Sequence, residues 1–279
     1  MYSVTAAYVL EFIFLFFLHF DLVTVRCCQF CRWRVEKCCG LLIDRLVGWL
    51  LQWPSRHRMF VFYRVLVAAY AVGITVMSIL LHDDLLPWPT WLTNWSYLLL
   101  TCHLLCAAVV VLLNTCFEHH HYVTPLMTSP IPCYMKLSWF LFSVATPAAL
   151  IVSTVFFAGV FPRLHRDHLN VVDINMHVMN TVLVILEFTL SAFPVRLLHA
   201  VYVFLYGLVY VIFSVIYWAF DHSNVMYPGV LDWNAPATTA VVLVVLTFVG
   251  IPLLQLFLFG VYQLRRYVCT CCVQLQWLQ

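Results

Sequence analysis

The segment from Thr238 to Tyr262, TTAVVLVVLTFVGIPLLQLFLFGVY, contains no Asp, Glu, Lys or Arg. It is longer than the about 20 apolar residues that a helix needs to cross a bilayer. Comparable apolar runs occur at five earlier places: Phe60 to Leu81, Trp91 to Leu113, Leu137 to Val160, Met176 to Phe193 and His199 to Phe220. The pattern predicts an all-α fold, a polytopic transmembrane helix bundle with six spans.

The composition excludes a water-soluble protein. Of 279 residues, 64% are hydrophobic and only 9% are charged, whereas soluble domains have roughly 45–50% and about 25%. The net charge of +2 is too small for a nucleic-acid-binding protein, and no glycine-rich phosphate loop is present. The partners we expect are membrane lipids and other membrane proteins, with no nucleic acid, no cofactor and no assigned oligomeric state.

Basic residues predict how the chain is oriented, because short cytoplasmic loops are rich in Lys and Arg. Twelve of the fourteen basic residues lie on the side of both termini, and two lie on the other side. We therefore expect an integral protein of the plasma membrane or an endomembrane, with both termini cytosolic. The expected organisation is an interfacial segment (1–58), a membrane domain (59–262) and a Cys-rich tail (263–279).

The apolar stretch from Val4 to Phe20 is too short and too interrupted, by Glu11, to assign. It is compatible with an extra crossing, an interfacial helix or a signal-like segment.

The cysteines are concentrated on the predicted cytosolic side. Juxtamembrane cysteines beside basic residues are typical substrates for S-acylation, so we predict lipidation at Cys27, Cys28, Cys31, Cys38, Cys39, Cys269, Cys271 and Cys272. The alternative is metal binding by Cys27, Cys28 and Cys31, together with Cys38 and Cys39 or with His119, His120 and His121. The spacing is unlike the paired Cys motifs of structural zinc sites, so we predict no metal.

Polar residues form stripes within three of the predicted spans. The stripe of the fourth span must face inward, since polar groups are costly in lipid. Ten residues, or about 15 Å, separate Thr93 from His103 and His177 from Glu187, so two His-containing pairs are expected at matching depths. The stripes predict a cavity lined by Ser96, His103, Thr181, Glu187, Tyr206 and Tyr210.

Three interpretations of these stripes stay open. Thr93 with His177 as its base would form a nucleophile pair, with Asn180 as an oxyanion donor. The same residue types also join transmembrane helices by hydrogen bonds without any catalysis. An ion path is a third interpretation, although one carboxylate makes a poor relay.

Four motifs carry a resemblance to a known family: Trp91-Leu-Thr-Asn-Trp95, His177-x-x-Asn180, Phe193-Pro-x-Arg-x-x-His199 and Tyr227-Pro-Gly-Val-Leu-Asp-Trp233. Their order and spacing resemble those of the rolling stone proteins, multi-pass membrane proteins associated with muscle-cell fusion in insects. The resemblance covers Tyr63 to about Tyr262 and implies a role in cell–cell fusion or membrane organisation.

The same core is more distantly similar to the androgen-induced and androgen-dependent proteins, which are intramembrane threonine hydrolases of fatty-acid esters of hydroxy fatty acids. That resemblance implies Thr93 as nucleophile and His177 as catalytic base, although Asn94 and Trp95 depart from the pattern. Ester hydrolysis is therefore the alternative function. A direct fusogen is disfavoured, because the predicted outer loops, 82–90, 161–175 and 221–237, are short and contain no fusion peptide.

Overall fold

The structure, a computed structural model, describes residues 56–82, 87–118, 133–163, 168–191 and 193–276. It divides into two units. The larger unit comprises residues 53–122 and 133–264 and contains the helix bundle. The other comprises 1–52, 123–132 and 265–279, and only the last turns of the final helix are described in it.

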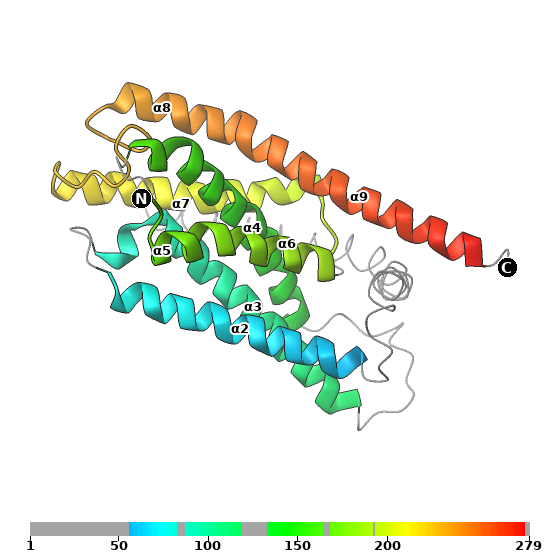
Figure 1. The fold of residues 1–279 in the computed structure, drawn as a ribbon. Helices are drawn as coiled ribbons and strands as arrows, with labels where there is room; N and C mark the ends of the chain where they lie inside the picture. The colour runs from blue at the N-terminus through cyan, green and yellow to red at the C-terminus, as the bar shows by residue number, and fades with distance from the viewer. Residues whose placement is uncertain (1–55, 83–86, 119–132, 164–167, 192, 277–279) are drawn as a thin grey trace, which may run out of the picture. The chain divides into compact units, whose positions relative to one another are not determined.

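The described residues form helices and no strands (Figure 1). The long helices are α2 (Arg56–Leu80), α3 (Leu92–Glu118), α4 (Cys133–Val155), α6 (Asn180–Leu190), α7 (Ala200–Phe220), α8 (Pro236–Val245) and α9 (Ile251–Gln276). Short elements complete them: α5 (Val171–Asp173), the 3₁₀ turns η1 (Trp88–Thr90), η3 (Phe161–Arg163) and η5 (Leu197–His199), and the π-helical turns η2 (Phe156–Val160), η4 (Ile174–Met179) and η6 (Leu246–Gly250).

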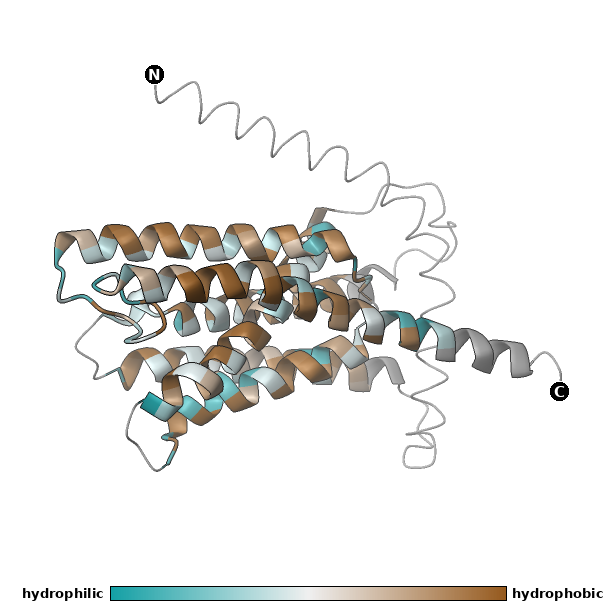
Figure 2. Cartoon of the chain, turned by 90° about the horizontal axis from the view of Figure 1, so that it is seen from above, coloured by the Kyte–Doolittle hydropathy of each residue, from teal (hydrophilic) through white to brown (hydrophobic). Residues whose placement is uncertain are grey.

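Six of the resulting helical segments are long and apolar enough to cross a membrane, which confirms the predicted number. They are Met59–Leu80, Leu92–Leu113, Cys133–Arg163, Val171–Leu190, Leu197–Phe220 and Pro236–Tyr267. Apolar residues run along these helices, and hydrophilic residues gather at their ends (Figure 2). This distribution is the one expected for helices whose outer surfaces contact hydrocarbon.

The ends of some spans differ from the sequence prediction. The fourth span begins at Val171 rather than Met176, because Asn170 caps it. The Asn170 side chain accepts a hydrogen bond from Asp173 N at 2.6 Å, and the Asp173 carboxylate accepts one from Asn170 N at 3.3 Å. The last helix runs on to Gln276, past the predicted end of the sixth span at Tyr262.

Two of the π-helical turns have the same local cause. Pro162 follows η2 by two residues, and Pro252 follows η6 by two residues. A proline has no N–H to donate and its ring clashes with the carbonyl four residues before it. The preceding turn widens, which leaves both helices continuous through the proline. The third turn, η4, has no proline, so this cause does not apply to it.

The helices pack with very different density. Helix α4 contacts α3, α6 and α7, and α3 also contacts α2. Small side chains let α2, α3 and α4 approach one another closely. The buried alanines at these contacts are Ala68, Ala71, Ala108, Ala145 and Ala149. In its most apolar window the third span is 61% buried, whereas the fifth and sixth spans are only 17% and 11% buried. The core therefore lies among α2, α3, α4 and α6, and α7 and α8–α9 are loosely packed.

Candidate functional site

The polar face of the fourth span points into the bundle, as expected from its stripe. His177, Asn180, Glu187 and Ser191 are all buried. Thr181 is half-buried and donates a hydrogen bond to the His177 carbonyl at 3.0 Å. These side chains do not form one group. Glu187 and Ser191 belong to an ion cluster, whereas His177 and Asn180, in or next to η4, lie in separate environments.

The ion cluster joins α2, α3 and α6. Arg64 Nη1 lies 2.6 Å and 2.5 Å from the two oxygens of Glu187, and Arg64 Nη2 donates to Ser191 Oγ at 2.8 Å. Ser191 Oγ in turn donates to Glu187 Oε1 at 2.6 Å. His103 Nε2 lies 3.1 Å from the same carboxylate oxygen. The pairing of His103 with Glu187 is the one that the depth comparison predicted.

Arg64 is the member of this cluster that sequence reasoning missed. Arg64 is one of the twelve basic residues on the side of the termini, close to the start of the first span, yet the residue is only 5% exposed. The signal was present, because Arg64 and Glu187 are opposite charges inside apolar spans and such residues pair with one another. Aromatic rings of Phe60 and Tyr63 also lie beside the guanidinium, at 4.9 Å and 5.8 Å.

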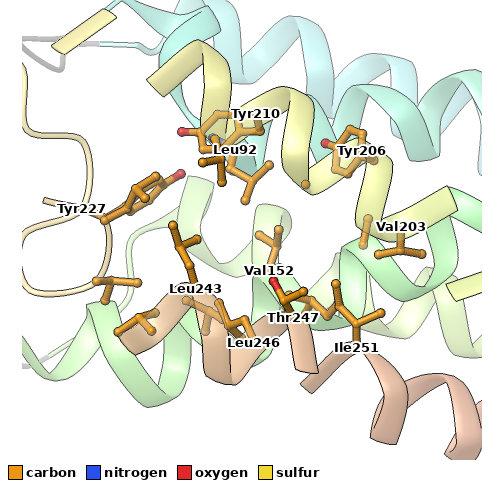
Figure 3. Close-up of a pocket in the computed structure, with 18 of the residues that line it drawn as sticks. Leu92, Val152, Val203, Tyr206, Tyr210, Tyr227, Leu243, Leu246, Thr247 and Ile251 are labelled. Atoms are coloured by element: carbon orange, nitrogen blue, oxygen red, sulfur yellow. Dashed lines mark hydrogen bonds between the residues drawn. The ribbon is translucent and has the colours of Figure 1, made fainter. Parts of the chain in front are cut away.

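A cavity of about 290 Å³ lies between α4, α7 and the α8–α9 helix (Figure 3). Aliphatic side chains form most of its wall, including Val152, Val203, Leu243, Leu246 and Ile251. The π-helical turns η2 and η6 both contribute lining residues, Phe156 and Thr247 among them. Irregular helical turns of this kind are frequent at functional sites. The cavity is therefore the leading candidate for a binding site.

Hydroxyl groups gather at one end of this cavity. Tyr210 Oη donates to the Thr90 carbonyl at 2.8 Å and accepts from Leu92 N at 3.1 Å. Tyr227 Oη accepts from Thr93 N at 3.5 Å, and burial raises the pKa of Tyr227, which lies outside the spans. The hydroxyl of Tyr206, one turn of α7 away, is buried and has no hydrogen-bond partner among the described residues.

The Tyr-Pro-Gly turn holds Tyr227 against the cavity. Tyr227 and Leu231 form a two-residue β-bridge around Gly229, which adopts φ 72°. A β-carbon at Gly229 would lie 3.0 Å from Arg163 Nε, and Arg163 donates to the Gly159 carbonyl. The turn thus requires glycine for its backbone conformation and for the close approach of Arg163. As a result Tyr227, Val230 and Leu231 of the turn lie in the cavity wall together with residues of the third span.

The structure places the predicted site residues in three environments. Thr93, Tyr206 and Tyr210 line the cavity, whereas His103 and Glu187 belong to the ion cluster. Two more of the predicted lining residues, Ser96 and Thr181, are not in the cavity wall. Asn180 is fully buried, and neither atom of its amide has a partner among the described residues.

Thr93 and His177 are not hydrogen-bonded to each other in the part of the chain that the structure describes. Thr93 is engaged with Tyr227, while the His177 ring stacks on Phe156 with a centroid distance of 3.6 Å and an interplanar angle of 6°. Two features explain why the contact between His103 and Glu187 is not matched by one between Thr93 and His177, ten residues away along each helix. Ten residues rotate a helix by about 80°, and η4 changes the angle per residue around His177.

The predicted lipidation sites lie beyond the described side chains. Cys27, Cys28, Cys31, Cys38 and Cys39 are outside the described residues. Cys269, Cys271 and Cys272 belong to α9, where only the backbone is described. Cys102, Cys106 and Cys133 are free thiols, and no three His, Cys, Asp or Glu side chains come together at a metal-binding distance within the described ranges.

Together these features define a polytopic α-helical membrane protein whose six spans contain a buried ion cluster and an apolar cavity. The sequence profile of a family described as protein rolling stone matches residues 47–277. Protein rolling stone of Drosophila melanogaster is 29% identical over 233 residues, which cover 77% of this chain and 82% of that protein. The chain therefore belongs to the rolling stone family. No solved structure matches it.

Two of the motifs that carried the resemblance meet in the structure. Trp91 and Tyr227, from separate motifs, are in edge-to-face contact with ring centroids 5.3 Å apart. A third motif lies elsewhere, where the Trp139 indole donates to the Pro194 carbonyl at 3.0 Å and Gln255 donates to the Arg196 carbonyl at 2.6 Å. The motif residues thus join helices that are distant in sequence.

Proposed function

We propose that this protein acts in cell–cell fusion or in the organisation of its own membrane, and that it does so by engaging lipids and membrane-protein partners in that bilayer. The observation that carries the proposal is the cavity. It lies between transmembrane helices, its wall is almost wholly apolar, and two of its helices are loosely packed. A cavity of this kind is suited to hydrocarbon and unsuited to a water-soluble ligand.

Action within its own bilayer also fits the connections between spans. The segment 221–235 is held down at several points: the Asn224 amide donates to the Tyr217 carbonyl, Trp233 donates to Ser214 Oγ, and Trp218 donates to Asn234 Oδ1. A connection tied to its own helices is poorly suited to inserting into an opposing membrane. The distribution of basic residues supports placing both termini in the cytosol of a cell expressing the protein at its plasma membrane or an endomembrane.

Ester hydrolysis by Thr93 and His177 finds no support in this geometry. A nucleophile and its base must lie within hydrogen-bond reach, directly or through one water. Thr93 lines the cavity, but His177 is not part of its wall and its ring is stacked on Phe156. The cavity is therefore interpreted as a binding site.

A photoactivatable fatty acid, supplied to cells so that it enters all their lipids, tests this function. Crosslinks mapped by mass spectrometry on the full-length protein are expected at Val152, Val203 and Leu243, in addition to the bilayer-facing Val241 and Phe248. Crosslinks confined to Val241 and Phe248 would show that no lipid enters the cavity. In a parallel assay with two cell populations and a split reporter, expression is expected to change the extent of cell fusion.

S-acylation of the cysteines near the cytosolic face is a separate part of the proposal. Lipid chains on Cys27, Cys28, Cys31, Cys38, Cys39, Cys269, Cys271 and Cys272 would strengthen the attachment of both terminal segments to the membrane. Hydroxylamine-dependent acyl exchange is expected to report modification that disappears when these eight residues are replaced by Ser. Stoichiometric zinc without any thioester would favour the metal alternative.

A further inference from the structure

We infer that the cavity binds one uncharged, single-chain lipid, such as a monoacylglycerol, with its polar end at the tyrosine hydroxyls and its chain between α4, α7 and α8–α9. This inference rests on the proposed function and names the ligand of the same site. Four observations support it: the charge of the wall, the volume, the position of the hydroxyls and the route by which a lipid reaches the cavity.

The wall selects against a charged ligand. Every lining residue is aliphatic, aromatic, Gly or Thr, and none is Asp, Glu, Lys, Arg or His. A carboxylate or phosphate in such a site would lose its hydration without gaining a counter-charge. The ion cluster cannot supply one, because Arg64 is already bound to Glu187 and Ser191. The ligand that matches this wall therefore has no net charge.

The volume selects for a single chain. About 290 Å³ is near the lower limit of small-molecule sites, which are roughly 300–1,000 Å³. It is about twice the engineered cavity of roughly 150 Å³ that holds one benzene. The cavity extends along α7 from Tyr210 to Val203, seven residues or about 10 Å. This space accommodates part of one acyl chain and is too small for the two chains of a phospholipid.

The hydroxyls determine which end of the lipid goes where. Tyr210 and Tyr227 lie at one end of the cavity, and Val203 and Ile251 lie at the other (Figure 3). Thr93, whose N–H donates to Tyr227 Oη, also lines the cavity. Tyr206 adds a buried hydroxyl without a partner among the described residues. A buried donor without an acceptor is costly, and an ester or hydroxyl oxygen of the ligand would supply an acceptor.

The cavity is reached from the side, through the bilayer. Phe204 and Leu208 line it, yet they are 40% and 42% exposed on the surface of α7. Between them in the wall lies Gly207, and a β-carbon built there would meet nothing within 4 Å. The wall formed by α7 is therefore thin and lies next to lipid. A chain can enter laterally without crossing water.

Gly207→Phe fills the cavity and gives the decisive variant, with Gly260→Phe as its matched control. Gly260 also lies in a transmembrane helix with nothing within 4 Å of a built β-carbon, but it is not part of the cavity wall. The full-length protein in neutral lipid vesicles is photolabelled with three diazirine probes: a monoacylglycerol, the corresponding fatty acid above its pKa, and a phosphatidylcholine. Labelling is quantified at Val152, Val203 and Leu243.

We expect the monoacylglycerol probe to label these residues at least about tenfold more than the two others. Gly207→Phe is expected to reduce that labelling at least about tenfold, and Gly260→Phe to leave it unchanged. Tyr206→Phe is expected to reduce the preference for monoacylglycerol over an uncharged alkyl probe of equal length.

The other outcomes separate this inference from the function on which it rests. If phosphatidylcholine or fatty acid labels the cavity as well as monoacylglycerol does, and Gly207→Phe abolishes that labelling, the ligand class is wrong and the lipid-engaging function stands. If Gly207→Phe labels like the native protein with every probe, no lipid occupies the cavity and both proposals fail.

Discussion

The bundle has two halves that treat polar groups in opposite ways. Among α2, α3 and α6, Arg64, His103, Glu187 and Ser191 satisfy one another within a tightly packed core. Between α4, α7 and α8–α9, an apolar cavity carries a hydroxyl without a described partner, and two of the three helices around it, α7 and α8–α9, are mostly exposed. In the first half the opposite charges neutralise one another within the protein, whereas the second half leaves an open space beside the Tyr206 hydroxyl.

This difference shows how to distinguish polar residues that only join helices from polar residues that border a binding site in a membrane bundle. Polar groups in hydrocarbon must find partners, and most of them do so by joining helices. Glu187 is the most conspicuous polar residue of the sequence, yet its bonds are fully used inside the protein. The less conspicuous Tyr206 and Thr93 border the space that a ligand can enter. Burial of charge alone is therefore a poor guide to the binding site here.

The largest effect is expected from breaking the ion cluster. Glu187→Gln leaves the Arg64 guanidinium buried without its counter-charge, so the unfolding free energy should fall by about 3–5 kcal/mol. Unfolding in mixed detergent micelles would measure this loss. The double variant Arg64→Met with Glu187→Leu should recover much of it, since replacing a buried pair by apolar residues is often close to neutral.

A matched control for that cluster lies on the same helix. Thr189 is exposed, and its hydroxyl bonds only carbonyls of α6 itself, those of Ile185 and Leu186. Thr189→Val should change stability by less than about 0.5 kcal/mol. An equal loss in Thr189→Val and Glu187→Gln would mean that the cluster does not stabilise the first half of the bundle.

A smaller effect is expected at the hydroxyl end of the cavity. Tyr210→Phe removes the bond to the Thr90 carbonyl and leaves Leu92 N without its acceptor, so stability should fall by about 1–3 kcal/mol. Tyr217→Phe on the same helix is the control, because that hydroxyl makes neither bond. Thermal unfolding that shifts equally in both variants would argue against a stabilising role for the Tyr210 hydroxyl.

The turn that carries Tyr227 should respond less strongly. Gly229→Ala imposes a β-carbon at φ 72° and against Arg163, which should cost about 1–2 kcal/mol. Gly73→Ala is the contrasting change, since Gly73 is helical with open space around it, and it should stabilise α2 by up to about 1 kcal/mol. If the unfolding free energy falls in Gly229→Ala and rises in Gly73→Ala, the loss comes from the backbone conformation of the turn and not from replacing a glycine as such.

The smallest effect is a pH dependence at Tyr227. Burial raises the pKa of the Tyr227 phenol above the ordinary value of about 10, so the folded state keeps this phenol protonated at a pH where the unfolded chain ionises it. Its contribution to stability is complete below about pH 10 and is lost as the pH rises through the folded-state pKa. The stability of Tyr227→Phe should therefore fall less than that of the native protein between pH 9 and 11.

Several features of the candidate site could be read from the sequence. The register of α3 and α6 followed from helix rise alone, because both spans were predicted to run in the same direction, and it identified the His103–Glu187 contact. Arg64 could also have been included, since a basic residue inside an apolar run needs a partner. The cavity could not be anticipated, because its wall is made of ordinary Val, Leu and Phe residues that occur in every span.

The sequence by itself determined the number of spans, most of their boundaries and the inward orientation of the fourth. The physical reason is that these properties depend on local features, namely runs of apolar residues, prolines and a helical period of 3.6 residues. Only the tertiary structure decided that Arg64 joins Glu187, that His177 stacks on Phe156 and that α7 stands apart enough to leave a cavity. Those outcomes depend on wide helical turns and on how side chains of distant helices fit together, which no local pattern specifies.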